Sequence, residues 1–128
     1  RAAHTNDSED ALLSALSLSV PALGGFARDG MLDPAWSPVN HDFTGMPPVF
    51  IQVGGQEVLR SDAEQLAERC ADAGVPCTVQ VWDKAIHVFH FGADILPEAR
   101  TAIAHLAGFI RTAVDDGVPS TLRRVAAA

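Results

Sequence analysis

The clearest hydrophobic pattern lies in the middle of the chain, between residues 49 and 114. Residues 49–53 read V-F-I-Q-V and are followed by two glycines. A short, mostly apolar and β-branched run of this kind is typical of a strand that is buried on both faces. Residues 77–82 read C-T-V-Q-V-W, with polar and apolar positions in alternation. This second segment also predicts a strand.

Two other segments carry apolar residues at helical spacing. The sequence S-D-A-E at residues 61–64 is a capping box, which predicts a helix start, and Gly74 with Pro76 predicts the end of that helix. A second helix is predicted from Pro97 to Val114. Its apolar face would consist of Ala99, Ile103, Leu106, Ala107 and Ile110. Strand–helix–strand–helix in this order predicts a right-handed βαβ unit with two parallel strands, and hence the α/β fold class.

The segments on either side of this unit have weaker patterns. Residues 11–27 predict one or two short helices, and residues 29–48 contain four prolines and two glycines, which favour an extended, turn-rich connection. We therefore divide the chain into a helical and turn-rich connecting segment (1–48), a βαβα core (49–114) and a tail (115–128).

Composition and charge exclude several classes of function. The 128 residues are 48% apolar and 20% charged, with a formal net charge of −7, which fits a globular protein and argues against nucleic acid as a partner. No uncharged apolar run is long enough to span a bilayer. We expect a cytoplasmic protein. The chain begins with Arg1 rather than Met, so we expect that an N-terminal part, with any targeting signal, has been lost.

The two cysteines, Cys70 and Cys77, lack the spacing of a zinc site. We expect two reduced, partly buried thiols, and the alternative is a disulfide between them. The pair His87-x-x-His90 has no further ligand cluster beside it, so we expect no metal.

Two residues that follow the predicted strands could carry chemistry together. Glu57 comes just after the first strand and His87 just after the second. Because functional groups gather beyond the carboxyl ends of parallel strands, we expect the two side chains to meet. A carboxylate that orients a histidine makes two of the three members of a nucleophilic triad. The alternatives are a solvated loop glutamate and a buried structural histidine. His90 is the nearest competing imidazole, whereas His4, His41 and His105 have no partner pattern.

Six segments of the chain carry a resemblance to a known family. They read D-P-A-W-S-P-V (33–39), F-T-G-M-P-P (43–48), I-Q-V-G-G-Q-E-V-L-R-S-D (51–62), A-G-V-P-C-T-V-Q-V-W (73–82), I-H-V-F-H (86–90) and L-P-E-A (96–99). In this order and spacing the chain resembles the C-terminal part of bacterial esterases of the hormone-sensitive lipase family, a branch of the α/β-hydrolase fold. Residues 1–48 would then lie on the cap side.

The resemblance also implies roles for individual residues. Glu57 looks like the triad acid, and His87 looks like the triad base. Many members of the family have aspartate at the acid position, and one branch has glutamate. Asp62 resembles an acid that supports the histidine loop, although simple helix-start electrostatics explains it equally well. No cofactor is implied. The substrate of the complete enzyme would be a small acyl ester.

The nucleophile of such a triad is absent from the sequence. None of the seven serines lies in a G-x-S-x-G elbow, and no H-G-G-G oxyanion loop is present. We therefore expect a fragment of a carboxylic ester hydrolase that is inactive alone and whose partner is the missing N-terminal half. We also expect a homodimer through an edge strand at residues 77–82. The alternative is a non-catalytic α/β interaction module.

Overall fold

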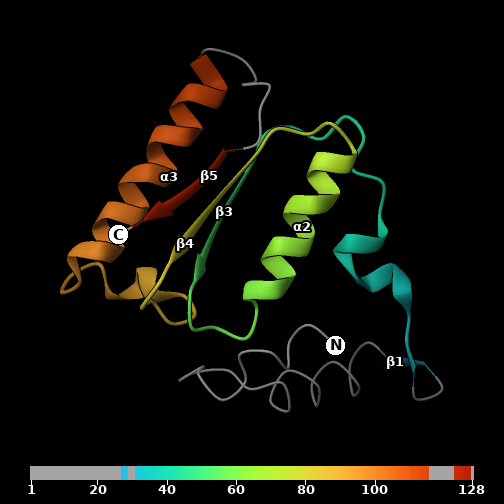
Figure 1. Cartoon of the computed structure of the whole chain (residues 1–128), viewed down its shortest axis with the longest axis horizontal. Helices are drawn as coiled ribbons and strands as arrows, with labels where there is room; N and C mark the ends of the chain where they lie inside the picture. Colours follow the sequence, from blue (N-terminus) through green and yellow to red (C-terminus); the bar gives the residue numbers. More distant parts are fainter. Residues whose placement is uncertain (1–26, 29–30, 116–122, 128) are drawn as a thin grey trace.

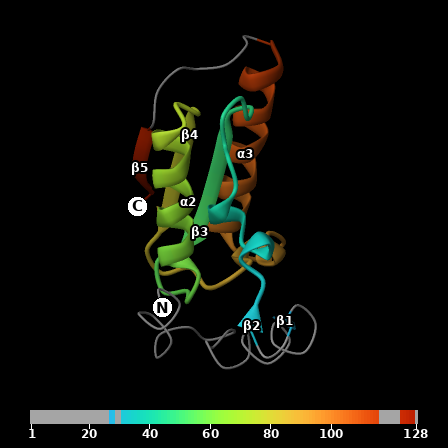
Figure 2. The same ribbon diagram turned by 90° about the vertical axis from the view of Figure 1, so that its right-hand side faces the viewer.

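The computed structural model describes residues 27–28, 31–115 and 123–127, and its centre is a parallel sheet (Figure 1). The sheet contains β3 (Val49–Gly54), β4 (Cys77–Trp82) and β5 (Arg123–Ala127) in the order β3–β4–β5. Helix α2 (Arg60–Asp72) connects β3 to β4, and helix α3 (Pro97–Asp115) follows the loop after β4. Figure 2 shows the two helices on either side of the sheet. The βαβα core predicted from the pattern is thus confirmed.

The two faces of the sheet differ in polarity because side chains alternate along a strand. The face toward α2 is apolar, and its core includes Val53, Val79, Ala63, Ala67 and Cys70. On the face toward α3, the ring of Phe50 stacks on that of Phe109, with centroids 5.0 Å apart. This second face also carries two glutamines and Trp82, so it combines polar and aromatic residues.

The capping box predicted at residues 61–64 is wrong. The helix begins at Arg60, its N-cap is Leu59, and no side chain caps it. The Ser61 hydroxyl is buried and has no hydrogen-bond partner among the described residues. Glu64 pairs instead with Arg60, whose Nε lies 3.5 Å from Oε1. The end of the helix is as predicted, because Gly74 follows it with a φ of +68°.

The turn-rich segment before β3 is tied to the outside of α2. It contains the short helices η2 (Pro34–Trp36) and η3 (Pro38–Asn40), preceded by a small antiparallel pair, β1 (Ala27–Arg28) and β2 (Met31–Leu32). The Arg69 guanidinium donates hydrogen bonds to the carbonyls of Val39 and His41, at 2.9 and 3.2 Å. Phe43 is buried in the core beside α2. The helices predicted at residues 11–27 lie outside the described residues, apart from Ala27 in β1.

The expectation that residues 77–82 form the outer edge of the sheet is wrong. Strand β5 pairs with β4 in parallel, from Thr78↔Arg123 to Trp82↔Ala127, so β4 is the central strand. This strand lies within residues 115–128, for which the sequence pattern predicts only a tail. A dimer through residues 77–82 would have to displace β5. Within the described residues both outer strands have a free edge: β5 on one side of β4 and, on the other side, β3, which pairs only with β4.

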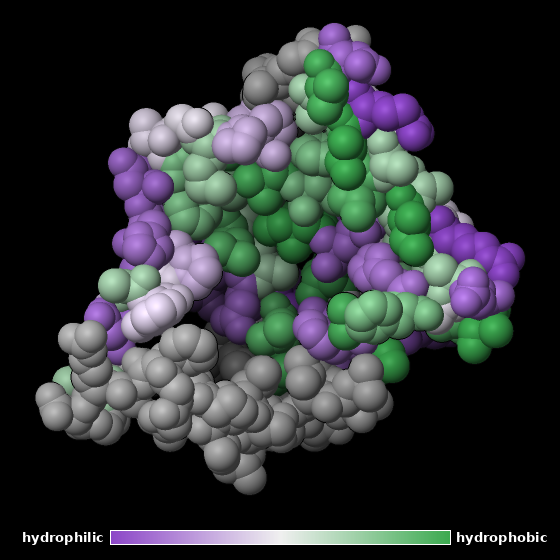
Figure 3. Space-filling view, turned by 180° about the vertical axis from the view of Figure 1, so that it is seen from behind, coloured by the Kyte–Doolittle hydropathy of each residue, from purple (hydrophilic) through white to green (hydrophobic). Residues whose placement is uncertain are grey.

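An apolar stripe on α3 lies beside this free edge. Ile103, Leu106, Ile110 and Val114 are exposed, from 37% at Leu106 to 76% at Val114. Helical spacing puts them on one flank of α3. The opposite flank carries His105, which contacts Gln80 and Trp82 of β4. Apolar side chains run along α3 in Figure 3. Among the residues that the structure describes, no element covers the stripe or pairs with the outer side of β3, and we call the two together the unpartnered surface.

We expect this surface to drive association of the isolated chain, because an unpaired parallel edge beside apolar side chains is a template for pairing. Light scattering at micromolar concentration should give a mass above the 13.5 kDa of one chain. Ile110→Lys should lower that mass, whereas Thr112→Lys, the same charge change off the stripe, should leave it unchanged. A wild-type mass of one chain would contradict the expectation.

The two cysteines are free and buried, as predicted, and Cys70 lies against Cys77. Burial, together with the neighbouring Cys70, raises the pKa of the Cys77 thiol to about 12. Because both side chains are buried and the thiolate is the reactive form, we expect neither thiol to react with a disulfide reagent at pH 8 until the chain unfolds. An introduced cysteine at the exposed position Glu68 should react at once. Rapid labelling of Cys77 in the folded chain would refute this.

Candidate active site

Glu57 lies in the turn between β3 and α2. Its side chain is buried, with the residue only 6% exposed. The turn is held by hydrogen bonds from Arg60, whose main-chain N–H donates to the Glu57 carbonyl at 3.2 Å and whose guanidinium donates to the Gly55 carbonyl at 3.3 Å. The carboxylate is therefore not a solvated loop residue.

His87 lies in the loop between β4 and the short helix η4 (Phe89–Gly92). Its Nδ1 is 3.4 Å from Oε2 of Glu57, slightly beyond the usual hydrogen-bond distance of about 2.7–3.2 Å. Nδ1 is buried and makes no hydrogen bond within the described residues, so its approach to Glu57 is a close contact without hydrogen-bond geometry. The side chain as a whole is 30% exposed. One ring nitrogen thus faces the carboxylate while part of the ring is open to solvent.

Two glycines let the loops after the strands come together. The Gly55 N–H donates to the Trp82 carbonyl at 2.7 Å, which extends the parallel pairing beyond β3. A Cβ on Gly54 would overlap the main chain of Ala85, and one on Gly55 would come within 2.5 Å of the Asp83 carbonyl oxygen. Only glycine fits here, because backbone lies against backbone. The G-G sequence is therefore what allows Glu57 and His87 to meet.

We expect Gly54→Ala to lower the free energy of unfolding by about 1–3 kcal/mol or more, the usual cost of overpacking a site that cannot move. Gly108→Ala is the control. Its Cβ would meet only Arg111 Nη2, at 4.0 Å, and alanine favours a helix over glycine by about 0.5–1 kcal/mol. Urea unfolding should therefore show opposite signs for the two variants. Equal effects would mean that the loops can separate without cost.

Asp62 is in the first turn of α2, and burial raises the pKa of its carboxyl group. Among the described residues it makes no ion pair with His87. Both the supporting role and the helix-start alternative stay predictions. Of the remaining histidines, His41 bonds the Ala35 carbonyl at 2.7 Å, and His4 lies outside the described residues.

A polar network on the α3 face of the sheet was not predicted from the sequence. Gln52 and Gln80 are register partners in β3 and β4, and their side chains are joined by a hydrogen bond of 2.9 Å. His90 reaches Gln52 through Nε2 at 2.9 Å, and His105 reaches Gln80 through Nδ1 at 3.1 Å. The signal that could have revealed it is the single glutamine at the same position in two apolar strand sequences.

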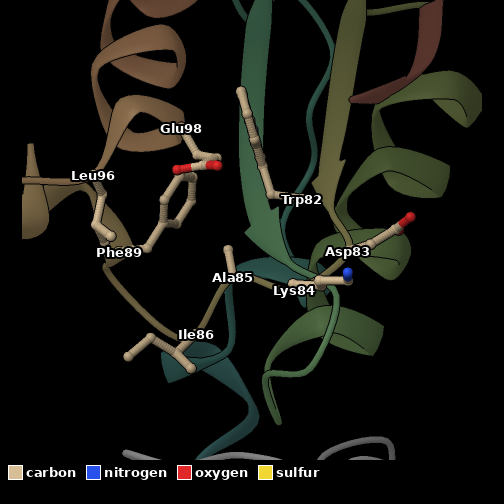
Figure 4. Close-up of a pocket in the computed structure, with 8 residues that line it drawn as sticks. All are labelled: Trp82, Asp83, Lys84, Ala85, Ile86, Phe89, Leu96 and Glu98. Carbon is tan, nitrogen blue, oxygen red and sulfur yellow. The ribbon is translucent and has the colours of Figure 1, made fainter. Parts of the chain in front are cut away.

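A cavity of about 540 Å³ lies behind the histidine loop. Figure 4 shows Trp82 on one side of it and Phe89, Leu96 and Glu98 on the other. Ala85 and Ile86, which directly precede His87, also line it. Its walls are mostly apolar. The loop that carries His87 is therefore supported by aromatic and aliphatic side chains on its inner side.

Comparison with known proteins shows the family to which the chain belongs. The family described as the α/β-hydrolase fold matches residues 4–91. The chain is 44% identical to an acetyl-hydrolase of Streptomyces hygroscopicus, in a match that covers 66% of this chain and 28% of that protein. It is 36% identical to the esterase LipU of Mycobacterium tuberculosis, in a match that covers 87% of this chain and 39% of that protein. The chain belongs to the α/β-hydrolase fold family.

Solved structures extend the similarity to the fold of esterases. An esterase from the bacterial hormone-sensitive lipase family is 38% identical, with a TM-score of 0.76 over 87% of this chain and 37% of that chain. The esterase EstE5, in crystals soaked with p-nitrophenyl butyrate, is 32% identical with a TM-score of 0.72. This member of the hydrolase family spans less than two fifths of the length of these relatives. The resemblance to this esterase family is thereby confirmed.

Residues 31–115 contain no group of three His, Cys, Asp or Glu side chains that could hold a metal ion. No helix in the described ranges is long and apolar enough to cross a bilayer.

Proposed function

We propose that this chain supplies the acid and the base of a Ser-His-Glu triad in a carboxylic ester hydrolase. The observation that supports the proposal is the approach of Nδ1 of His87 to Oε2 of Glu57, at 3.4 Å, beyond the ends of two parallel strands. Membership of the α/β-hydrolase family supports the same reaction type. The roles of both residues are inferred from this geometry and from the resemblance.

The buried carboxylate would hold the ring in one tautomer. With the proton on Nδ1, facing Glu57, the Nε2 atom of His87 is left unprotonated and can act as a general base. It would take the proton of the serine hydroxyl as the serine attacks the ester carbonyl. It would then give that proton to the departing alcohol. Glu57 would stabilise the imidazolium that forms between these two steps.

The nucleophile must come from outside these 128 residues. The sequence contains no G-x-S-x-G elbow, and without a serine and an oxyanion hole the orienting pair has no acyl-transfer chemistry to perform. We infer that the complementary part of the hydrolase adds a strand along the free edge of β3 and covers the apolar stripe of α3. Short acyl esters are the proposed substrates, because relatives carry the names acetyl-hydrolase and esterase.

The roles can be tested in a chimera. In the chimera, this chain replaces the matching segment of the hormone-sensitive lipase-family esterase. Hydrolysis of p-nitrophenyl butyrate by the chimera is then measured. We expect His87→Ala to lower kcat by about 10³–10⁴-fold or more, as removal of a triad base does. Glu57→Gln should also lower kcat strongly, because the ring loses its orientation. His41→Ala, at a histidine whose ring bonds the Ala35 carbonyl, should change kcat less than about twofold.

The isolated chain is the second arm of this experiment. It should hydrolyse the ester no faster than free imidazole, and a fluorophosphonate probe should label none of its serines. Labelling of a serine together with turnover of the ester would refute the inference that the chain lacks a nucleophile. A chimera that loses no activity with His87→Ala would refute the triad and favour the non-catalytic interaction module.

A further inference from the structure

We propose that Gln52 and His90 form a positioning pair that holds the loop carrying His87 against the sheet. The pair itself is a structural contact that can be tested in the chain alone. Its catalytic consequence rests on the proposed function. Neither residue would touch the substrate, since His90 is bonded on the α3 side of the sheet and Gln52 is a half-buried strand residue.

The main chain of α3 fixes the orientation of the Gln52 amide. Its nitrogen lies 2.9 Å from the Ala102 carbonyl oxygen, which can only accept, and 2.9 Å from Oε1 of Gln80. Both amide hydrogens are therefore donated, and the Gln52 oxygen faces His90. At 2.9 Å this oxygen must accept from Nε2 of His90. The tautomer of His90 with the proton on Nε2 follows from the geometry.

The far end of the network is adjustable, in contrast to the His90 end. Nδ1 of His105 lies 3.1 Å from Nε2 of Gln80 and 3.3 Å from its Oε1. An exposed ring placed between a donor and an acceptor can serve either tautomer. The fixed part of the network is thus the link from His90 through Gln52 to the Ala102 carbonyl of α3.

The loop between β4 and His90 needs such an anchor because its backbone is strained. Val88, directly after His87, has a φ of +50°, in the left-handed region. A β-branched residue is unfavourable in this region. The residues after Val88 are held in place by ring contacts. The Phe89 ring packs on Trp82 with ring centroids 5.6 Å apart, and the His90 ring packs on Phe89 with ring centroids 4.1 Å apart. Losing the Gln52 bond would release one side of the loop.

Burial lowers the pKa of His90 below its ordinary value, so the ring stays neutral at neutral pH. Its link to Gln52 uses an N–H that is present in the neutral tautomer. A carboxylate in place of the amide oxygen would favour the charged ring instead. This difference provides a spectroscopic signature of the direct contact.

The contact is tested by NMR titration of the histidine rings in the 128-residue chain. With Gln52→Glu we expect the titration midpoint of His90 to rise by about one pH unit, since an opposite charge would lie within hydrogen-bond distance. Gln65→Glu is the matched control. Gln65 lies on α2 and its side chain bonds the Ser61 carbonyl at 3.4 Å, so the His90 midpoint should not move. An unmoved midpoint in Gln52→Glu would overturn the pairing.

The positioning role is tested by two substitutions of His90 in the chimera. A glutamine amide can occupy the place of Nε2 and donate to Gln52, whereas the shorter asparagine reaches only the place of Nδ1. We expect His90→Asn to lower kcat on the order of 10- to 100-fold, the cost of a catalytic group displaced by about 1 Å, with little change in KM. His90→Gln should recover most of that loss.

These outcomes separate the two proposals. Equal kcat values for His90→Gln and His90→Asn would overturn the positioning role, even where His87→Ala abolishes activity and the triad stands. If His87→Ala leaves activity intact, the triad fails, and the NMR titration still decides whether Gln52 and His90 are paired.

Discussion

The arrangement of this chain depends on one close approach of two backbones at the carboxyl edge of the sheet. There the Gly55 N–H bonds the Trp82 carbonyl at 2.7 Å, and neither Gly54 nor Gly55 has room for a Cβ. The two loops can therefore turn off their strands in contact with each other. Glu57 becomes buried by this contact, and the buried carboxylate comes to lie 3.4 Å from Nδ1 of His87. A larger residue in either place would separate the strand ends and with them the acid and the histidine.

The two faces of the sheet contribute in different ways. The α2 face is apolar and supplies most of the buried hydrophobic contacts, which are non-directional. The α3 face holds Gln52 and Gln80, whose hydrogen bonds have fixed donors and acceptors. Apolar packing can hold α2 in place without specifying one loop conformation, whereas the glutamine network sets where His90 and α3 lie. Leaving a buried polar group without a hydrogen bond costs about 1–3 kcal/mol of folding free energy. The α3 face therefore tolerates few alternative side-chain arrangements.

The sequence allowed most of the core to be predicted, because strands and helices have distinct periods. The predicted strand at residues 77–82 is confirmed residue for residue, and the predicted helix from Pro97 ends one residue later, at Asp115. The meeting of Glu57 and His87 was also predictable, since both follow parallel strands. The capping box failed because the helix starts two residues earlier, with Leu59 rather than Ser61 as its N-cap, and the Ser61 hydroxyl is buried rather than bonded to the first turn.

Other features could not be predicted because their causes are non-local. Strand β5 has a weak pattern, R-R-V-A-A, and forms beside β4 only through pairing across a long separation in sequence. The glutamine network depends on the register of two strands and on a carbonyl of α3. The strain at Val88 shows only in its backbone angle.

The free edge of β3 links the stability of the chain to its proposed chemistry. A parallel strand added at this edge would end on the same side of the sheet as Glu57 and His87, because parallel strands share one carboxyl edge. A serine carried beyond such a strand would arrive beside the histidine. A helix accompanying that strand would cover the apolar stripe of α3, whose residues are now exposed. Burial of the unpartnered surface and completion of the active site would then be a single event, which ties catalytic competence to assembly.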